Sequence, residues 1–477
     1  MMPPDRKRQL AAVLPAACLV ACMYWPVRDA AYRLDDLAWL SLRNNLAAGR
    51  SLLWALFSPQ AQGTIRPLGD RLWFLLASGL FGLNPVPIHL LALVFQLGNV
   101  VLVADVGRRL FSSYRAAGLA AVLWAVSDAL ATPMVWASAL NQVVCAFFFL
   151  LAFDALLRWE SSQKRIWLWT HVLSLVLSLG ALESAVVMPA VVAGYMLLPG
   201  KWNWKRLAPS AVTAAVYLAT HFVAAPLPKS GPYKLGGGWA MAGAFWHYWR
   251  TALGPFEYGR VYGAIAVANL GTAILTVAVL IWLGVCIKRG RWVPLFCLLW
   301  FVLTLAPVLP FPQHLMPYYL FLPSIGLAWF AADAVFAPGY WPLKAPAIAS
   351  LLLYVSCQIP STLFVRDWEA AQSRDVLQRE ARLVDSVRLI RLGQPQGPVF
   401  LTGFDSDQFW WGMCYGELGR LGFAGLHVMP DAGVPVPPRQ WCRQPDFQLS
   451  REETARLLHE GNAHLYDVSP WPPERRE

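Results

Sequence analysis

The sequence predicts an all-α polytopic membrane protein with a small extramembrane α/β domain at its C-terminus. Of its 477 residues, 57% are hydrophobic and only 14% are charged, whereas soluble domains carry about a quarter charged residues. Long apolar runs recur along the chain, and most are long enough to cross a bilayer. The residues after 366 have a different character, with polar stretches and turn residues between short apolar segments.

The apolar runs are expected to form the spans. They lie near residues 9–26, 68–83, 86–106, 116–132, 134–157, 166–181, 183–198, 207–225, 262–286, 292–309, 315–336 and 346–364. The run at 68–83 is the doubtful one, because it is short for a span and carries Asp70 and Arg71. The segment MAGAFWHYWRTALGPF (241–256) has an aromatic-rich face typical of a juxtamembrane helix.

Charge patterning decides the orientation of these spans. Short cytoplasmic loops are rich in Lys and Arg, and five basic clusters occur, around Arg6, Arg108, Arg158, Lys201 and Lys288. If 68–83 crosses the membrane, the Arg108 cluster and every later one lie outside. If 68–83 lies flat on the membrane, all five lie inside. The second arrangement predicts eleven spans, a cytoplasmic N-terminus and an external C-terminus.

This topology divides the chain into two domains. Residues 1–365 form the transmembrane domain, with an external loop at 27–85, and residues 366–477 form an external domain. In the tail, PQGPVFLTGF predicts a turn and a strand, and SREETARLLHEGNA predicts a short capped helix ending at Gly461. Cys414 and Cys442 can form a disulfide if this tail lies outside the cytoplasm.

The net positive charge and the many tryptophans are both explained by a location in the membrane. The net charge of +11 lies largely in the loop clusters, so we expect membrane lipids as partners and no nucleic acid. Many of the 24 tryptophans lie at the ends of apolar runs and are expected to be interfacial anchors, namely Trp124, Trp159, Trp167, Trp202, Trp292 and Trp300.

The adjacent acids Asp35 and Asp36 are the first candidates for chemistry. They follow the first apolar run, on the expected external face. A carboxylate there can act as a general base, or it can hold a divalent cation (Mg²⁺ or Mn²⁺) that bridges a phosphate. The alternative is that an acid caps the helix that begins there. Adjacent helical residues point about 100° apart, so we expect one acid to face a cavity and the other to cap, with a slight preference for Asp35 as the functional one.

Other external charges are weaker candidates. Asp128 lies at the external end of a span and either acts in chemistry or caps a helix, and Glu183 either functions or makes a structural pair. Arg66 can bind a phosphate as a fork. Lys229 and Lys234 either contact phosphate or are solvated.

Several motifs are absent from the sequence. It contains no Walker motif, no G-x-G-x-x-G, no G-x-S-x-G and no H-E-x-x-H, which argues against ATP-driven transport and several hydrolase classes. Its histidines, including His89 and His314, show no metal-ligand spacing.

Several segments in order resemble one family. They are the external DD, RPLGDRLWFLLASGLFGLNPVPIHLL, LGALESAVVMPAVVAGYMLL, LLWFVLTLAPVLPFPQHLMPYYLFLPSIGLAWF and VRDWEAAQSRDVL. Over roughly residues 1 to 375 the chain resembles the GT-C fold glycosyltransferases, and most of all bacterial relatives of the transmembrane O-mannosyltransferases that carry tetratricopeptide tails.

The resemblance implies a function and a location. It implies a hexosyl- or mannosyl-type glycosyltransferase in the bacterial inner membrane, with its C-terminal domain in the periplasm. The enzyme would move a sugar, with inversion, from a polyprenyl-phosphate donor to a glycan, lipid or protein acceptor. The resemblance places the catalytic acid at Asp35 or Asp36 and a second acid at Asp128, and it places Arg66, His89 and Glu183 at motif positions where they would bind substrate. Independently of the resemblance, we expect His314, Tyr318, Lys229 and Lys234 to be substrate contacts.

The chain also departs from the family's pattern. Leu182 stands where the family has a Lys, Tyr318 stands where it has an Arg, and the tail has no tetratricopeptide pattern. Four alternatives therefore stay open: a transporter or flippase of lipid-linked glycans, a polysaccharide polymerase, a polysaccharide ligase, and an inactive GT-C scaffold.

Overall fold

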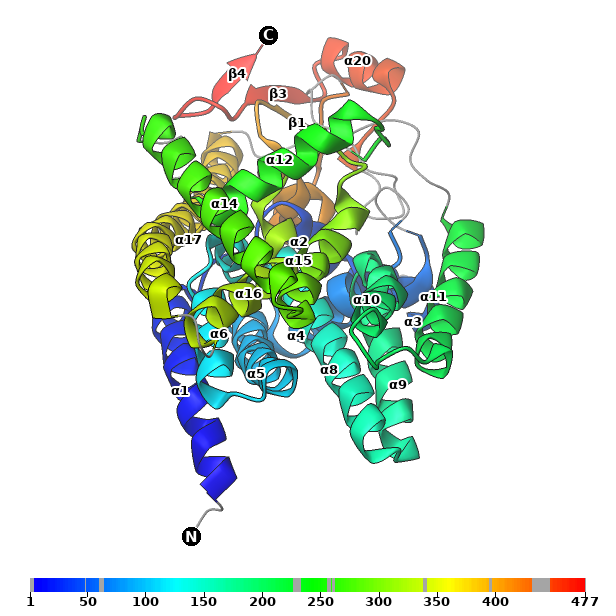
Figure 1. Ribbon diagram of the computed structural model, residues 1–477. Helices are drawn as coiled ribbons and strands as arrows, with labels where there is room; N and C mark the ends of the chain where they lie inside the picture. Colours follow the sequence, from blue (N-terminus) through cyan, green and yellow to red (C-terminus); the bar gives the residue numbers. More distant parts are fainter. Residues whose placement is uncertain are drawn as a thin grey trace. The chain divides into compact units, whose positions relative to one another are not determined.

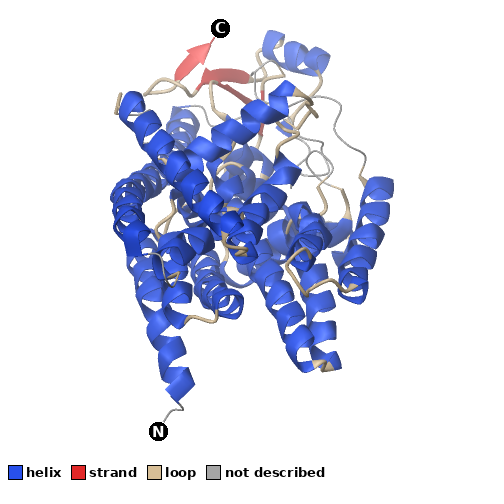
Figure 2. Cartoon of the chain, viewed as in Figure 1, coloured by secondary structure: helices blue, strands red, loops and turns tan. Residues whose placement is uncertain are grey.

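The computed structural model describes residues 4–47, 49–59, 64–225, 233–254, 259, 262–337, 341–393, 397–430 and 447–476. Helices dominate these residues, and the strands are confined to the C-terminal part (Figure 2). Contacts divide the chain into two compact units. The first unit comprises Met1–Arg28, Phe57–Asp70 and Ile88–Glu369, and the second comprises Asp29–Leu56, Arg71–Pro87 and Ala370–Glu477.

The first unit is a bundle of α-helices (Figure 1). Its described helices are α1 (Pro4–Tyr24), α5 (Val86–Phe111), α6 (Tyr114–Ala125), α7 (Ala131–Val135), α8 (Leu140–Ser162), α9 (Arg165–Ala181), α10 (Met188–Met196), α11 (Trp204–Ala224), α12 (Trp239–Leu253), α14 (Ile265–Lys288), α15 (Trp292–Leu305), α16 (Ser324–Phe336) and the first part of α17 (Trp341–Gly393). Helices α8 and α9 lie side by side, and α6 packs against both α1 and α16.

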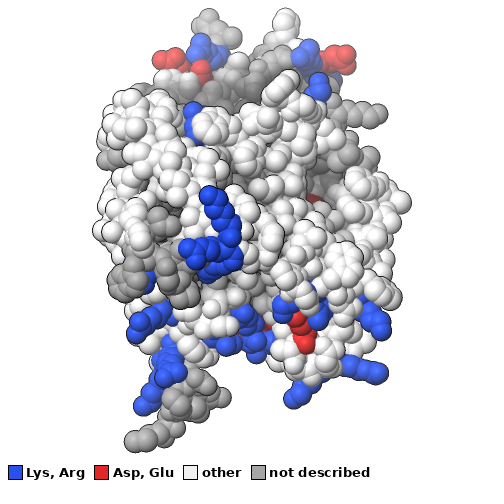
Figure 3. Space-filling model, viewed as in Figure 1, with Lys and Arg blue, Asp and Glu red and all other residues white. Residues whose placement is uncertain are grey.

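The predicted spans are present as apolar helices. Among the described residues, six helices are long and apolar enough to cross a membrane, a bent pair (Tyr114–Ala125 with Asp128–Val135) makes a seventh candidate, and four shorter apolar helices accompany them. These correspond one for one to the eleven predicted runs, and the chain is a multi-pass membrane protein. Figure 3 shows a wide face of mostly uncharged side chains, with Lys and Arg in the lower part of the view, in one group near the middle and at the top.

The doubtful run at 68–83 does not form a long helix. A π-helical turn, η3 (Pro67–Leu72), leads into α4 (Trp73–Phe81), which has only nine residues. At 1.5 Å per residue such a helix spans about 14 Å, less than half of a hydrocarbon core of about 30 Å. The length of α4 therefore agrees with the exclusion of this run from the predicted spans.

One span is interrupted, and a sharp break joins two other apolar helices; each of these breaks precedes a candidate acid. Ser127 has extended backbone angles (φ −68°, ψ 134°), and the chain bends by 62° before Asp128 begins the 3₁₀ turn η4 (Asp128–Leu130). Leu182 is also extended (φ −158°, ψ 135°), and Glu183 begins η6 (Glu183–Val187) directly after it. Broken helices of this kind free backbone groups and side chains from the regular helix surface.

Two of the expected interfacial tryptophans are instead in the core. Trp124 and Trp300 have no exposed surface, and their indole N–H groups donate to the carbonyl oxygens of Phe321 (3.0 Å) and Leu322 (3.2 Å). The anchor prediction is wrong for these two, because a buried acceptor satisfies the indole N–H as well as interfacial water does. Trp202, which is 72% exposed, keeps an environment compatible with an anchor.

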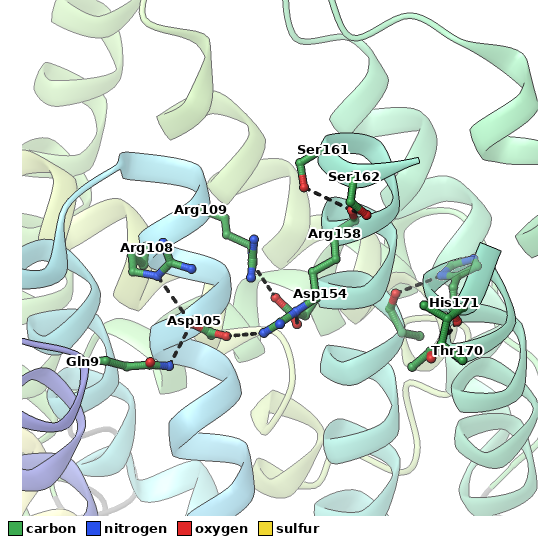
Figure 4. Close-up of polar contacts among 12 residues, drawn as sticks. Gln9, Asp105, Arg108, Arg109, Asp154, Arg158, Ser161, Ser162, Thr170 and His171 are labelled. Atoms are coloured by element: carbon green, nitrogen blue, oxygen red, sulfur yellow. Dashed lines mark hydrogen bonds and ion pairs between the residues drawn. The ribbon is translucent and has the colours of Figure 1, made fainter. Parts of the chain in front are cut away.

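A network of charges ties α5 to α8 (Figure 4). Asp154 accepts from Arg109 (2.8 Å) and Arg158 (2.5 Å), and Asp105 accepts from Arg158 (2.6 Å) and Arg108 (3.4 Å). The basic clusters around Arg108 and Arg158 therefore lie together at one end of the bundle. The predicted topology requires this, since it assigns both clusters to the same side; which side faces the cytoplasm stays a prediction.

The second unit contains a four-stranded sheet. The strands are β1 (Val399–Thr402), β2 (Leu426–Val428), β3 (His464–Asp467) and β4 (Glu474–Arg476), in the order β2-β1-β3-β4. β1 pairs in parallel with both β2 and β3, and β4 runs antiparallel to β3. The unit also contains α2 (Asp35–Ala47), α3 (Leu52–Phe57), α4, α18 (Ser406–Gln408), the π-helical turn η9 (Phe409–Cys414), α19 (Glu417–Arg420) and α20 (Arg451–His459).

The tail elements predicted from local signals are confirmed. β1 covers the predicted strand, and α20 begins after Ser450, whose hydroxyl accepts from the Glu453 N–H (3.1 Å), and ends before Gly461 at φ +70°. Cys414 is disulfide-bonded, and Cys442 lies outside the described residues.

The boundary predicted at residue 365 stays a prediction. The contacts assign the segments 29–56 and 71–87 to the same unit as the chain from Ala370 onward. Helix α17 belongs to both units. Its apolar stretch comes first, and charged residues recur from Arg366 to its end, so the half of α17 in the second unit lies beyond the membrane-spanning stretch.

Candidate functional site

The clearest polar cluster of the first unit surrounds Arg66. Its Nε donates to Glu183 Oε2 (2.7 Å), and its Nη1 donates to Asp70 Oδ2 (3.3 Å). Asn141 Nδ2 donates to the other oxygen of Asp70 (2.8 Å). Residues 117 positions apart are thus joined, and the guanidinium is held in one orientation by two carboxylates.

Local backbone geometry brings these groups together. Arg66 directly precedes the turn η3, and Asp70 lies within it. The two residues are four positions apart, so their side chains lie on the same face. A Cβ atom on Gly69 would overlap the Ala181 carbonyl oxygen and would lie 2.7 Å from Asn141 Cβ. Only glycine therefore allows this turn to lie so close to the C-terminal end of α9.

Arg66 keeps its positive charge and some donor capacity. Burial alone would lower the pKa of its guanidinium, but Glu183 and Asp70 outweigh burial and raise that pKa well above its ordinary value. Among the described residues, no partner is bonded to its Nη2 group. Glu183 Oε1 and Asn141 Oδ1 are also buried without a hydrogen-bond partner in the described part of the chain.

A cluster of three aromatic side chains, Tyr233, His314 and Tyr319, lies close to Arg66. The rings of Tyr233 and His314 have centroids 4.4 Å apart, and the rings of His314 and Tyr319 are 5.8 Å apart. Burial, and then the charge of Arg66, lower the pKa of His314, so its imidazole is neutral at neutral pH. Its Nε2 has no hydrogen-bond partner within the described ranges.

Two further sequence candidates lie beside this group in the chain. Tyr318 is largely buried, with its ring 4.9 Å from that of Tyr319. Lys234 follows Tyr233 directly and is exposed. Lys229 lies outside the described residues.

Asp128 has different neighbours. Its Oδ2 accepts from Ser361 (3.0 Å), and its backbone N–H donates to Gln358 Oε1 (3.1 Å), both on α17. It is only 4% exposed. These contacts fit a residue that fixes the broken span against α17. His89 is buried near the start of α5.

The acid pair belongs to the second unit, and its two members differ. Asp36 has no exposed surface, and its Oδ2 accepts from the backbone N–H of Arg33 (3.0 Å). Asp35 is exposed at the first residue of α2. Asp36 thus serves the start of the helix, and Asp35 is the member whose carboxylate is accessible from solvent.

Some residues of the Arg66 cluster were not candidates from the sequence. Asp70 carried a signal, since it stands four residues after Arg66, where two side chains meet on a helical turn. Asn141, Tyr233 and Tyr319 carried none, because an isolated amide or phenol is common in membrane helices and loops. Their role arises only from long-range packing.

A metal site does not emerge from the described residues. No group of three or more His, Cys, Asp or Glu side chains among them is arranged to hold an ion. The divalent cation expected beside the acid pair therefore stays a prediction.

An apolar cavity of about 300 Å³ lies elsewhere in the first unit. It is bounded by α12, α14, α16 and α17, and its lining is almost entirely aliphatic and aromatic. Such a cavity within apolar helices suits a hydrocarbon chain.

No protein-family model and no curated protein matches the chain by sequence. Comparison with solved structures does find proteins of similar fold. ArnT from Cupriavidus metallidurans bound to undecaprenyl phosphate is similar over 96% of this chain and 93% of that one, with a TM-score of 0.52 and 14% identity. ArnT in the apo state is similar over 95% and 92%, with a TM-score of 0.51 and 12% identity.

A more distant likeness is to a longer protein. The apo oligosaccharyltransferase of Archaeoglobus fulgidus gives a TM-score of 0.49 at 13% identity, and this chain spans only 63% of its length. The full-length match to ArnT confirms the predicted fold, whereas the closer resemblance to relatives of the O-mannosyltransferases stays a prediction. The chain has a GT-C fold.

Proposed function

We propose that the chain is a glycosyltransferase that moves a sugar from a polyprenyl-phosphate donor to an acceptor on the external face of a bacterial cytoplasmic membrane. The observation that carries the proposal is the similarity, over 96% of the chain, to ArnT bound to undecaprenyl phosphate. The disulfide-bonded Cys414 supports an external C-terminal domain, because disulfides persist outside the reducing cytoplasm.

Arg66 is the proposed contact for the donor phosphate. Its Nε and Nη1 are held by Glu183 and Asp70, which leaves Nη2 for a phosphate oxygen. The two carboxylates exceed the single guanidinium by one negative charge, so a second cation is needed to favour an anion there. Lys234, exposed next to Tyr233, is the proposed second contact.

The polyprenyl chain needs an apolar surface within the membrane. The cavity bounded by α12, α14, α16 and α17 offers such a surface. We assign it to the hydrocarbon part of the donor. A bulky substitution in its wall, such as Ala331→Trp, is expected to raise KM for long-chain donors and to spare donors with short chains.

The reaction itself requires a base and a stabilised leaving group. The acceptor hydroxyl attacks the anomeric carbon, the new C–O bond forms with inversion, and the bond to the phosphate oxygen breaks. The phosphate departs with the bonding electrons, and Arg66 stabilises its charge. The hydroxyl proton passes to a carboxylate, for which exposed Asp35 and the unpartnered Oε1 of Glu183 are the candidates.

The experiment measures sugar transfer in membranes that contain the full chain. Labelled polyprenyl-phosphate hexoses and pentoses are supplied, and release of polyprenyl phosphate is followed. We expect release that depends on the chain and falls about a hundredfold in Arg66→Lys, because Lys lacks the planar fork. Arg388→Lys, at a side chain 60% exposed, is the matched control and is expected to match the wild type.

The possible outcomes of this experiment test the overall function, the phosphate contact and the base separately. Release from no donor in the panel would contradict the glycosyltransferase function. Activity equal to wild type in Arg66→Lys would contradict the phosphate contact alone. Of Asp35→Asn and Glu183→Gln, the base is the one that lowers kcat at unchanged KM.

A further inference from the structure

The turn that leads into α2 has an unusual backbone. Leu34 has φ +49°, a left-handed conformation that is uncommon for a residue other than glycine. Because Leu34 immediately precedes Asp35, this conformation sets the direction in which the first residue of α2 leaves the turn. Asp36 holds the turn from one side by accepting the Arg33 N–H.

A carboxylate from the C-terminal part of the same unit holds the turn from the other side. Asp407 Oδ1 accepts the backbone N–H of Leu34 at 2.8 Å, across 373 residues of sequence. The Asp407 side chain is only 8% exposed. A hydrogen bond to an ionised group in such a desolvated place is stronger than the same bond in water.

Asp407 is itself held in place by ion pairs and hydrogen bonds with neighbouring residues. Arg379 Nη2 lies 3.4 Å from its second oxygen, and Arg379 also pairs with Asp405. Asp405 caps α18, which carries Asp407, by accepting the Gln408 N–H (2.9 Å). The Gln408 amide in turn donates to the Arg379 carbonyl (2.8 Å).

We propose that Asp407 is a positioning residue for Asp35, acting through the backbone of Leu34. The C-terminal domain thereby takes part in the reaction without touching substrate. This inference rests on the proposed function, in which Asp35 is a candidate base.

The electrostatics of Asp407 favour orientation over simple packing. Burial raises the pKa of its carboxyl, the Leu34 N–H opposes that rise, and the Asp405 charge adds to it. An apolar side chain would fill the same volume without desolvating a charge. A buried carboxylate directed at a backbone N–H instead defines the direction of that N–H.

The experiment compares Asp407→Ala, Asp407→Asn and the control Asp385→Asn in the full chain in nanodiscs. Asp385 is in the same unit but half-exposed. Hydrogen exchange is measured at residues 33–36 and, as a test of folding, across α20. Transferase kcat and KM are measured on the same samples.

We expect faster exchange at 33–36 and unchanged exchange at α20 in Asp407→Ala, with kcat lower by about tenfold and KM for the donor unchanged. Asp407→Asn, which keeps an acceptor oxygen, should lie between Asp407→Ala and the wild type. Asp385→Asn should change nothing. An intermediate exchange rate and kcat in Asp407→Asn would show that the effect depends on the quality of the hydrogen-bond acceptor. Loss of packing volume alone would affect only Asp407→Ala.

Two results would overturn the proposal: unchanged exchange at 33–36, or faster exchange with unchanged kcat. If Asp407→Ala loses protection at α20, Asp407→Asn decides, since its shape is preserved. If the wild type transfers no sugar, the proposed function fails, and the exchange data still test whether Asp407 holds the backbone at Leu34.

Discussion

Asp35 and Asp36 are neighbours in sequence but have opposite environments. Asp36 is fully buried and accepts a backbone N–H, whereas Asp35 is exposed. A buried acceptor whose loss leaves an N–H unsatisfied contributes to stability. An exposed carboxylate contributes little to stability, so substitution of Asp35 is expected to affect chemistry rather than folding.

Substitution of the two acids should therefore separate folding from catalysis. Asp36→Ala is expected to lower the free energy of unfolding by about 1–3 kcal/mol, because the Arg33 N–H loses its partner. Asp35→Ala should leave stability within about 0.5 kcal/mol. Denaturation midpoints in detergent measure both. Equal destabilisation by the two variants would contradict the division of roles.

The turn η3 shows how an element positions a side chain. It brings Arg66 and Asp70 onto one face, and Gly69 lets that face approach Ala181 and Asn141. The site geometry thus depends on a glycine that has no functional group. Neither charge nor hydropathy patterns identify such a residue.

Gly69→Ala is expected to be destabilising by about 1–3 kcal/mol, because the added methyl overlaps backbone and forces the turn away from Asn141. Gly79→Ala is the matched control. Its Cβ would meet nothing within 4 Å, and within helix α4 alanine is favoured over glycine. Thermal unfolding compares the two. A neutral effect of Gly69→Ala would show that the turn can shift at little cost.

The second half of α17 carries a buried carboxyl that makes stability depend on pH. Burial, together with Asp407, Asp405 and Glu417, raises the pKa of Glu380 from its ordinary 4.5 to about 8, and Arg379 opposes the rise. A pKa raised by folding means that the folded state holds its proton more tightly. The stability from this group is complete below about pH 4.5 and is lost as the pH rises towards 8.

Protease resistance of the C-terminal part of the full chain should therefore fall between pH 5 and pH 8, the window that this shift defines. Glu380→Gln keeps the neutral shape and should flatten the profile, with greater resistance than the wild type at pH 8. Glu460→Gln, at an exposed site, should behave as the wild type. A profile that persists unchanged in Glu380→Gln would assign the dependence to other groups.

The molecule as a whole combines an apolar helical bundle with a second unit that has its own core. That core is formed by residues of α17, β1, β2, η9 and the segment near Phe447. The charge network between α5 and α8 joins two clusters that are expected on the cytoplasmic side. The disulfide-bonded Cys414 belongs to the second unit, expected on the opposite side.

Orientation can be tested on intact cells. A protease added to spheroplasts should cleave the chain after residue 366 and leave the basic loops uncut, because an external tail is accessible and cytoplasmic loops are not. Inverted vesicles are the control and should give the reverse pattern. Cleavage at the Lys201 loop in spheroplasts would contradict the predicted topology.

The sequence by itself determined those elements that have a local signal. Eleven apolar runs, the short helix after Leu72, the strand at Val399–Thr402 and the capped helix Arg451–His459 follow from hydropathy, charge and capping, which act between residues close together in the chain. The GT-C resemblance was also legible from the order of short motifs, and the full-length fold match bears it out.

Only the tertiary structure decided which of these residues meet. The bond from Arg66 to Glu183 spans 117 residues, and the bond from Leu34 to Asp407 spans 373. The tertiary structure also shows that Trp124 and Trp300, which were expected at the membrane interface, are buried in the core. The physical reason is that a local pattern specifies the form and exposed face of an element, whereas partners distant in sequence are selected by packing and by the need to satisfy every buried polar group.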